Sequence, residues 1–466
     1  MMTAKWRSFS RRLSAGSLSR NGLAALGQSV VGVVSMFLAY RLIIAHAGLE
    51  RFGVWSLLLA GTALARVGDV SGGGALARFV ASAKSETGLQ NSRDVVHTVL
   101  LSSLFLNAIV GLAIWIGATP LLPMFIEPQY LAEAKTLIPY VAMNIVLGAL
   151  SIAVTSGIDG AQRADQRAIV ISVASLIFLG ACWFFVPRLG VVGFAVAQLL
   201  QQAVMLVLGW IVLRRYIPLL GWFPYRWRLD VFVETTGYAI KLNAIGLIGL
   251  MFEPLAKFAF NHAGGPGLVA LYELSSRLVL QVRGLIIAAL TPIVPAFASY
   301  KGPQDPAFRQ VLEKASTLAV IASIGATIAT LVALPIVSIV ILDRLSTELI
   351  TLTAALTLGW SLNIFVIPIY FAAQAIGILR WNFLSHTVMA LSVVMGVTLV
   401  GDVGPWGLVA AIVIGLTTSM LVILFGNVRA LAVVSTFKKL RLWWLAAALV
   451  NLLLCLVAGL PLVLLR

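Results

Sequence analysis

Residues 22–48 read GLAALGQSVVGVVSMFLAYRLIIAHAG, an apolar stretch that ends in a cation, a histidine and a glycine. A membrane-spanning helix needs about 20 mostly apolar residues, and this stretch satisfies that length. Further runs of this kind follow along the chain of 466 residues, and together they predict an all-α polytopic membrane protein with thirteen spans. The predicted spans are residues 22–45, 53–76, 95–118, 137–157, 168–187, 190–213, 236–260, 268–298, 314–342, 346–374, 383–401, 405–428 and 442–465.

The composition excludes several classes of protein. Hydrophobic residues make up 60% of the chain and charged residues 11%, and the mean hydropathy is +1.01. A soluble protein this apolar would lack the polar groups to cover its surface. The net charge is +16, but the cations do not gather on a polar domain, so we expect no nucleic-acid partner. Cys182 and Cys455 lie in apolar runs and define neither a disulfide framework nor a zinc site.

The loop cations predict the orientation of the chain. Between the predicted spans, 22 Lys and Arg residues fall on the side of the N-terminus and five on the opposite side. Cytoplasmic loops carry an excess of Lys and Arg, so the N-terminus is predicted to be cytoplasmic. Anionic phospholipids of the cytoplasmic leaflet are the expected partners of these loop cations.

An internal repeat divides the spans into two sets of six. The sequence from Arg41 to His46-Ala47-Gly48 is matched 216 residues later by the sequence from Lys257 to His262-Ala263-Gly264. Residues 190–193 (GVVG) match 404–407 (GPWG), and Ala-Gln pairs precede an arginine at 161–167 and 373–380. Halves with an even number of spans share one orientation, so the repeat is parallel.

This repeat gives the predicted domain organisation. We expect a cytoplasmic basic tail at 1–21, a six-helix bundle at 22–213, a cytoplasmic linker at 214–235, a second six-helix bundle at 236–428, and a final segment with an extra transmembrane helix at 429–466. In parallel-repeat transporters one half moves against the other around a central substrate site. The architecture therefore predicts a carrier.

An enzyme is disfavoured by what the sequence lacks. The longest predicted outer loop, residues 119–136, is too short for a catalytic domain, and there is no P-loop and no HExxH motif. His46 and His262 have no second metal ligand spaced near them. We therefore expect no catalytic residues, no cofactor and no metal site.

A stretch near the N-terminus resembles a known family. Residues 48–58 (GLERFGVWSLL), Arg66-Val-Gly-Asp69 and residues 77–81 (ARFVA) resemble the opening of the polysaccharide transporters, the flippases for O-antigen and exopolysaccharide repeat units. That family belongs to the multidrug/oligosaccharidyl-lipid/polysaccharide exporter superfamily. The resemblance extends over the twelve-span core, about residues 22–428, whereas relatives more often have twelve or fourteen spans than thirteen.

The resemblance implies a fold, a cargo and a location. The fold would be two six-helix bundles forming a V around a central cavity. The cargo would be an oligosaccharide on undecaprenyl pyrophosphate, moved from the inner to the outer leaflet of the bacterial inner membrane for lipopolysaccharide or exopolysaccharide synthesis. A polysaccharide polymerase is an expected partner.

Charges inside the predicted spans are the candidate site residues. A charge at the bilayer centre costs about 2.5 kcal/mol or more, so it usually faces a cavity or a partner. We predict that five cations bind the pyrophosphate, since arginine binds phosphate oxygens in pairs. Three acids are predicted to balance charge or to couple transport to H⁺ or Na⁺. The cations are Arg41, Arg66, Lys257, Arg277 and Arg283, and the acids are Asp69, Glu253 and Glu273.

Simpler interpretations of these charges remain open. Glu253 and Lys257, like Glu273 and Arg277, are four residues apart and can form local ion pairs that serve insertion alone. Lys241, Arg41 and Lys257 lie near span ends and can extend to the membrane surface. Including Lys241, the predicted spans hold six cations and three acids, a surplus that favours an anionic cargo. The rival functions are a cation-coupled multidrug or small-molecule exporter of the same fold, and a membrane enzyme or scaffold of polysaccharide assembly.

Overall fold

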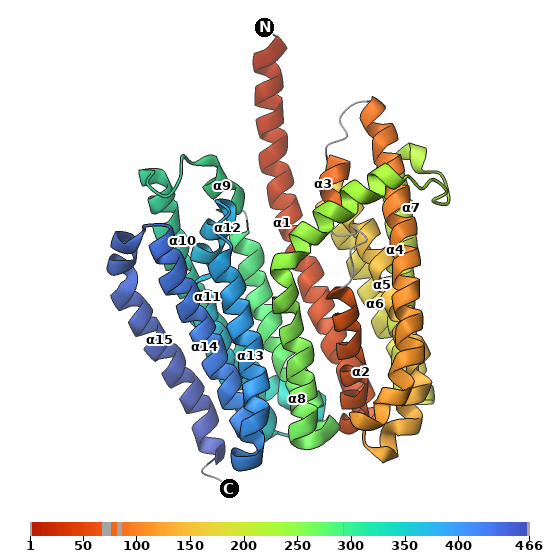
Figure 1. The fold of residues 1–466 in the computed structure, drawn as a ribbon, viewed down its shortest axis with the longest axis vertical. Coiled ribbons are helices and arrows are strands. Elements are labelled where there is room, and N and C mark those ends of the chain that lie inside the picture. Colours follow the sequence, from red (N-terminus) through yellow and green to blue (C-terminus); the bar gives the residue numbers. More distant parts are fainter. Residues whose placement is uncertain (1, 68–75, 82–85, 292, 464–466) are drawn as a thin grey trace. The chain divides into compact units, whose positions relative to one another are not determined.

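The computed structural model describes residues 2–67, 76–81, 86–291 and 293–463, and these ranges contain helices, turns and no strand. The all-α prediction is therefore confirmed. Figure 1 shows the helices, which are α1 (Met2–Ala47), α2 (Leu49–Val67), α3 (Leu76–Ala81), α4 (Glu86–Leu121), α5 (Pro128–Gly160), α6 (Ala164–Leu189), α7 (Val191–Tyr216), α8 (Leu229–Leu290), α9 (Ile293–Ser299), α10 (Pro306–Leu342), α11 (Thr347–Ile364), α12 (Ile367–Ala375), α13 (Arg380–Val403), α14 (Pro405–Ala430) and α15 (Val434–Val463), with 3₁₀ turns at Leu122–Met124 and Pro218–Leu220.

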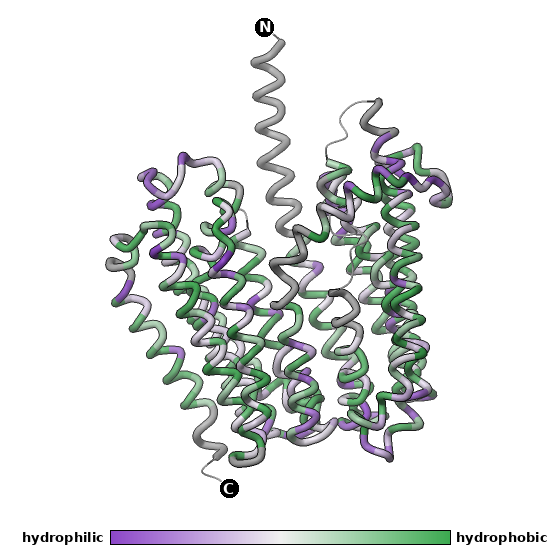
Figure 2. Tube along the Cα trace, viewed as in Figure 1, coloured by the Kyte–Doolittle hydropathy of each residue, from purple (hydrophilic) through white to green (hydrophobic). Residues whose placement is uncertain are grey.

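The predicted spans coincide with these helices. Within the described ranges, nine helices are long and apolar enough to cross a membrane, and α11 with α12 forms a tenth candidate that is bent by 43°. The remaining three predicted spans overlap α2 and the two arms of α8. Hydrophobic residues run along the helices, and the most hydrophilic ones gather mainly in the connections at the helix ends (Figure 2). This distribution is the one that a bilayer requires.

Helix α8 contains a break at the point where the sequence predicts a loop. Gly264 and Gly265 have non-helical backbone angles, and Gly265 has a φ of 71°. Glycine adopts positive φ without the clash that a side chain would cause. The break separates residues 229–263 from residues 266–290, so α8 supplies the predicted seventh and eighth spans.

The chain divides into two compact units. Unit 1 comprises Met1–Gly48, Ala65–Met124 and Pro128–Asn243, and unit 2 comprises Leu49–Leu64, Phe125–Glu127 and Ala244–Arg466. The predicted first bundle includes residues 53–76, whereas the start of α2 belongs to unit 2. Local sequence determines that a span is helical, but it does not determine which other helices the span packs against.

Two helical hairpins, one in each unit, reproduce the internal repeat. Gly190 between α6 and α7 has a φ of 58°, and Gly404 between α13 and α14 has a φ of 68°. In both hairpins a second glycine permits close packing. A Cβ on Gly193 would lie 2.4 Å from the Phe185 carbonyl oxygen, and one on Gly407 would lie 2.9 Å from that of Leu399.

Similar turns follow the two Ala-Gln pairs of the internal repeat. Gln162, after α5, has a φ of 58°, and Gly377, after α12, has a φ of 81°. Each turn is closed by an N–H donating to a carbonyl five residues earlier, from Arg163 to Ile158 and from Ile378 to Ala373. The turn at Ala432, after α14, has a φ of 53° and is closed in the same way, from Val433 to Val428.

The start of α2 lies directly against the break in α8, within unit 2. A Cβ built on Gly53 would lie 1.7 Å from the Pro266 carbonyl oxygen, so only a glycine permits this approach of two backbones. Gly61, two turns further along α2, has no atom within 4 Å of its Cβ position. These two glycines of one helix therefore have different structural roles.

We expect Gly53→Ala to destabilise the protein and Gly61→Ala to leave it unchanged or stabilise it. Overpacking against a backbone costs about 2 kcal/mol, whereas alanine in an open helical position is favoured by about 1 kcal/mol over glycine. The unfolding temperatures of the two purified variants in detergent measure this difference. An unchanged unfolding temperature for Gly53→Ala would contradict the close packing of α2 on α8.

Candidate functional site

Four charged side chains of α8 form a closed ion-pair cluster in unit 2. The Lys257 ammonium lies 2.6 Å from Glu273 Oε2 and 3.5 Å from Glu253 Oε1. Arg277 Nε donates to Glu273 Oε1 at 2.7 Å, and its Nη2 lies 3.5 Å from Glu253 Oε1. Ser56 of α2 donates a hydrogen bond to Glu273 Oε2 at 3.0 Å. We call these four charged residues the α8 cluster.

The α8 cluster contains both pairs that the four-residue spacing predicts and two that it does not. Glu253–Lys257 and Glu273–Arg277 are the local pairs, and each lies within one arm of the helix. Lys257–Glu273 and Arg277–Glu253 connect the two arms. The break at Gly264–Gly265 makes these contacts possible, because it places residues on either side of it face to face.

Burial separates the members of the α8 cluster. The Lys257 and Glu273 side chains are 4% and 5% exposed, whereas those of Glu253 and Arg277 are 31% and 36% exposed. Two acids and two cations cancel in charge, so the cluster is neutral as a whole. Lys257 and Arg277 therefore do not belong to a cationic surplus.

A separate cavity in unit 2 surrounds Arg283, another of the predicted cations. Its volume is about 390 Å³, at the small end of the range for ligand pockets. Side chains from α8 and α11 to α14 line it, and no Asp or Glu is among these lining residues. The polar and aromatic ones are Arg283, Trp360, Asn363, Tyr370, Phe371, Ser385, His386 and Ser419.

Arg283 enters this cavity without a carboxylate partner in the described part of the chain. Its Nη2 donates to Asn363 Oδ1 at 3.1 Å, and the guanidinium carbon lies 4.5 Å from the centre of the Trp360 ring. Its Nε is buried and makes no hydrogen bond. Across the cavity, the Tyr370 hydroxyl and His386 Nε2 are 3.3 Å apart. A half-buried guanidinium without an acidic partner among the described residues is a potential anion site, because a bound anion would offset its desolvation cost.

The other predicted site residues are Arg41, Arg66 and Asp69. Arg41 is half-buried on α1, which belongs to unit 1. The side chain of Arg66 and the whole of Asp69 lie outside the described parts of the structure, as does the side chain of Lys241. The structure therefore brings together Glu253, Lys257, Glu273 and Arg277, and it places Arg283 in a cavity of its own.

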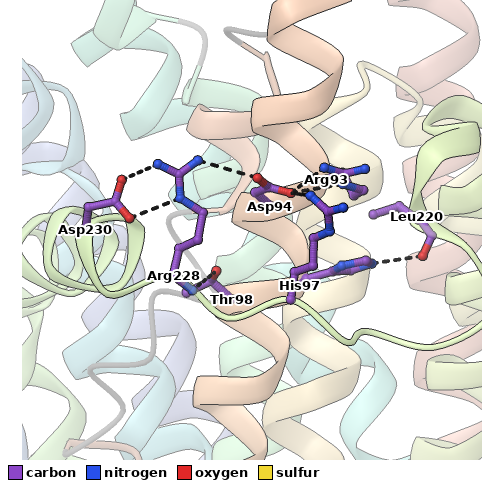
Figure 3. Close-up of polar contacts among 8 residues, drawn as sticks. Arg93, Asp94, His97, Thr98, Leu220, Arg228 and Asp230 are labelled. Carbon is purple, nitrogen blue, oxygen red and sulfur yellow. Dashed lines mark hydrogen bonds and ion pairs between the residues drawn. The ribbon is translucent and has the colours of Figure 1, made fainter.

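Sequence reasoning missed a third polar cluster, at one end of α4 in unit 1 (Figure 3). The Asp94 carboxylate is contacted by Arg93 at 2.9 Å, by Arg228 at 3.5 Å and by Arg226 at 3.8 Å. His97 Nε2 donates to the Leu220 carbonyl at 2.9 Å. The sequence analysis treated these arginines only as determinants of topology. A lone acid next to a predicted span was the signal for this cluster.

No metal site is apparent in the described residues. They contain no group of three His, Cys, Asp or Glu side chains close enough to hold an ion.

The comparisons with known proteins identify the fold. No family model matches the chain, and no curated protein matches it. Among solved structures, an inward-facing multidrug resistance MATE family transporter of the MOP superfamily has a TM-score of 0.70 at 15% identity, covering 89% of this chain and 99% of that one. The lipid II flippase MurJ, in an inward closed conformation, has a TM-score of 0.65 at 15% identity, covering 94% and 97%.

A third similar structure is a MOP superfamily transporter from Pyrococcus furiosus, described as having a binding pocket of reverse polarity. Its TM-score is 0.65 at 16% identity, and 88% of this chain and 95% of that one are covered. At this identity the likeness establishes the fold alone. The chain thus has the fold of these multi-pass membrane transporters, which serves both drug exporters and a lipid flippase.

We expect Glu273→Gln to be the most destabilising single change in the α8 cluster. It leaves the buried Lys257 with only the longer contact to Glu253, and breaking a buried ion pair costs about 3–5 kcal/mol. Glu253→Gln, at a more exposed carboxylate with contacts of 3.5 Å, is the matched control and should cost less.

The double variant Lys257→Met/Glu273→Gln completes a double-mutant cycle measured by thermal unfolding. We expect it to be more stable than Glu273→Gln alone, because the unpaired buried ammonium is removed with its partner. If the losses of stability in Glu273→Gln and Lys257→Met simply add up in the double variant, the pairing of these two side chains is contradicted.

Proposed function

We propose that the protein is a flippase that moves an undecaprenyl-pyrophosphate-linked oligosaccharide from the inner to the outer leaflet of the cytoplasmic membrane. The transport would proceed by alternating access of its two units and would serve the export of a surface polysaccharide. The observation that carries this proposal is the Arg283 cavity, in which a guanidinium has no acidic neighbour among the described lining residues.

The charge of this cavity favours an anionic cargo over a cationic one. A guanidinium offers a planar set of donors that binds two oxygens of a phosphate or carboxylate at once. Asn363 accepts a hydrogen bond from Nη2, and the Trp360 ring lies against the guanidinium carbon, so both orient its plane. A lipophilic cation would be repelled at this position.

The α8 cluster takes a different role in this proposal. Lys257 is buried between two carboxylates, so we assign it to charge balance and not to cargo binding. Arg277 is more exposed, and with Arg41 and Arg66 it remains a proposed second contact for the pyrophosphate. Glu253 and Asp69 remain proposed groups for coupling to H⁺ or Na⁺. A polysaccharide polymerase is a proposed partner at the outer face.

A cation-coupled multidrug exporter is the alternative. The likeness in fold to multidrug transporters supports it as well as the likeness to a lipid flippase supports the first proposal. Its chemistry would require an acid that is available to a cationic drug. Both described acids of the α8 cluster are engaged by cations, which argues against that use of them.

Transport by the protein in liposomes tests the proposal. We expect wild-type protein to move a fluorescent polyprenyl-pyrophosphate oligosaccharide to the opposite leaflet, where a membrane-impermeant quencher reaches it. Arg283→Gln should lower the rate by about tenfold or more, since a hydrogen bond to a charged group contributes about 1.5–3 kcal/mol. Arg283→Lys should retain part of the activity.

Arg188→Gln is the matched control, because the contacts of this arginine in the described part of the chain are with the Phe184 ring and carbonyl, at one end of α6. The unfolding temperature and the reconstitution yield of both variants are measured, so that their transport rates are compared for equally folded and equally incorporated protein. Full activity of Arg283→Gln would contradict the role of the cavity. Export of a lipophilic cation, without movement of the lipid-linked glycan, would favour the multidrug exporter.

A further inference from the structure

The segment from Ile217 to Arg228, which connects α7 to α8, combines a fixed backbone with outward aromatic side chains. Ile217 and Leu220 are buried in the hydrophobic core of unit 1. In contrast, Trp222, Phe223 and Tyr225 are 69%, 79% and 64% exposed. Large apolar side chains that gather on a surface usually mark a site of contact with another molecule or a membrane.

Polar contacts hold this segment against unit 1 from beneath. His97 donates to the Leu220 carbonyl at 2.9 Å, and Trp210 Nε1 donates to the Trp222 carbonyl at 2.9 Å. Nearer to α8, Trp227 Nε1 donates to Ser102 Oγ at 3.0 Å, and the Arg228 amide donates to Thr98 Oγ1 at 3.2 Å. The exposure of the aromatic side chains is therefore a property of an ordered backbone.

The position of the segment specifies what covers these rings. It begins directly after α7, a candidate membrane span that ends at Tyr216, and it leads into α8 at Leu229. Residues so close to a span end lie at the level of the lipid headgroups. Tryptophan and tyrosine are enriched at that level, because their rings are apolar and their polar atoms reach water.

The charge of the surrounding residues specifies the headgroup. Five arginines lie in or beside the segment, and Asp94 and Asp230 are the acids that they contact. Arg214 lies 3.7 Å over the Trp222 ring, and Arg226, 48% exposed, reaches Asp94 only at 3.8 Å. Arginine next to an interfacial aromatic ring suits the phosphate of an anionic phospholipid. The five arginines are Arg93, Arg214, Arg215, Arg226 and Arg228.

We propose that residues 217–228 form an interfacial anchor, in which Trp222, Phe223 and Tyr225 enter the headgroup region of one leaflet and Arg226 and Arg215 bind the phosphates of anionic phospholipids. The anchor fixes unit 1 at the membrane surface through the connection that leads to α8. Lipid binding at this surface does not require the cargo, so the anchor is tested independently of the flippase proposal.

Full-length protein in lipid nanodiscs tests the anchor. An environment-sensitive fluorophore is attached at Phe223→Cys, with Lys301→Cys, in the exposed turn before α10, as the control position. Cys182 and Cys455 are buried and are replaced by alanine in both. We expect lipids brominated on their acyl chains to quench the probe at residue 223 and to spare the one at residue 301.

A second measurement tests the headgroup. Mass spectrometry of the intact protein counts bound phosphatidylglycerol and phosphatidylcholine. We expect phosphatidylglycerol to be preferred, and Arg226→Gln to weaken its binding about fivefold, the effect of one cation near an anionic surface. Trp222→Ser should weaken the binding of both lipids, whereas Trp183→Ser, at an equally exposed tryptophan near the end of α6, should leave the phosphatidylglycerol preference intact.

Three results would overturn the anchor. The first is the absence of lipid quenching at residue 223, and the second is equal binding of the two lipids by wild-type protein. The third is the finding that another protein binds to this segment and shields residue 223 from lipid. Unfolding temperatures of the variants identify any loss of folding. Trp222→Ser should lower the temperature only slightly, because the side chain faces outward and loses its contact with the Arg214 guanidinium.

Discussion

The organisation of unit 2 depends on the cost of placing a charge inside a membrane. Glu273 is almost fully buried, and one carboxylate cannot remain there without cations and donors around it. Lys257, Arg277 and Ser56 supply them from both arms of α8 and from α2. Satisfying this carboxylate therefore requires the break at Gly264–Gly265 and the close approach of Gly53 to Pro266. The ion pairs, the break in α8 and the close packing of α2 therefore depend on one another.

The helices and the local ion pairs could be predicted from the sequence because both are encoded within a few residues. Runs of about 20 apolar residues predict spans, and a spacing of four residues predicts the Glu253–Lys257 and Glu273–Arg277 pairs. The contacts between the arms of α8 could not be predicted, since they depend on how a glycine break turns the chain. The membership of α2 in unit 2 could not be predicted either, because it depends on contacts such as that of Gly53 with Pro266, which join residues about 200 positions apart in the sequence.

The cations within the spans differ in whether an acidic side chain neutralises them. The net charge of +16 is set mainly by loops, and the sequence could separate these from the cations within the spans. It could not separate Arg277, which is neutralised, from Arg283, which lies in a cavity without an acid. That distinction depends on side chains from α11 to α13 that are about 80 to 100 residues away. The proposed anionic cargo is supported by this one guanidinium and not by a surplus of cations within the spans.

The assignment of Leu49–Leu64 to unit 2 has a consequence for the order in which the protein is made. A ribosome completes α2 long before it reaches α8, so Gly53 and Ser56 enter the membrane about 200 residues ahead of Pro266 and Glu273. Unit 2 therefore cannot fold as one continuous segment while that segment is being translated. Its first helix must wait, in lipid or beside an insertion factor, until the second half of the chain arrives. The two units are therefore interlaced along the polypeptide, and a cut between α7 and α8 would not release two complete folding units.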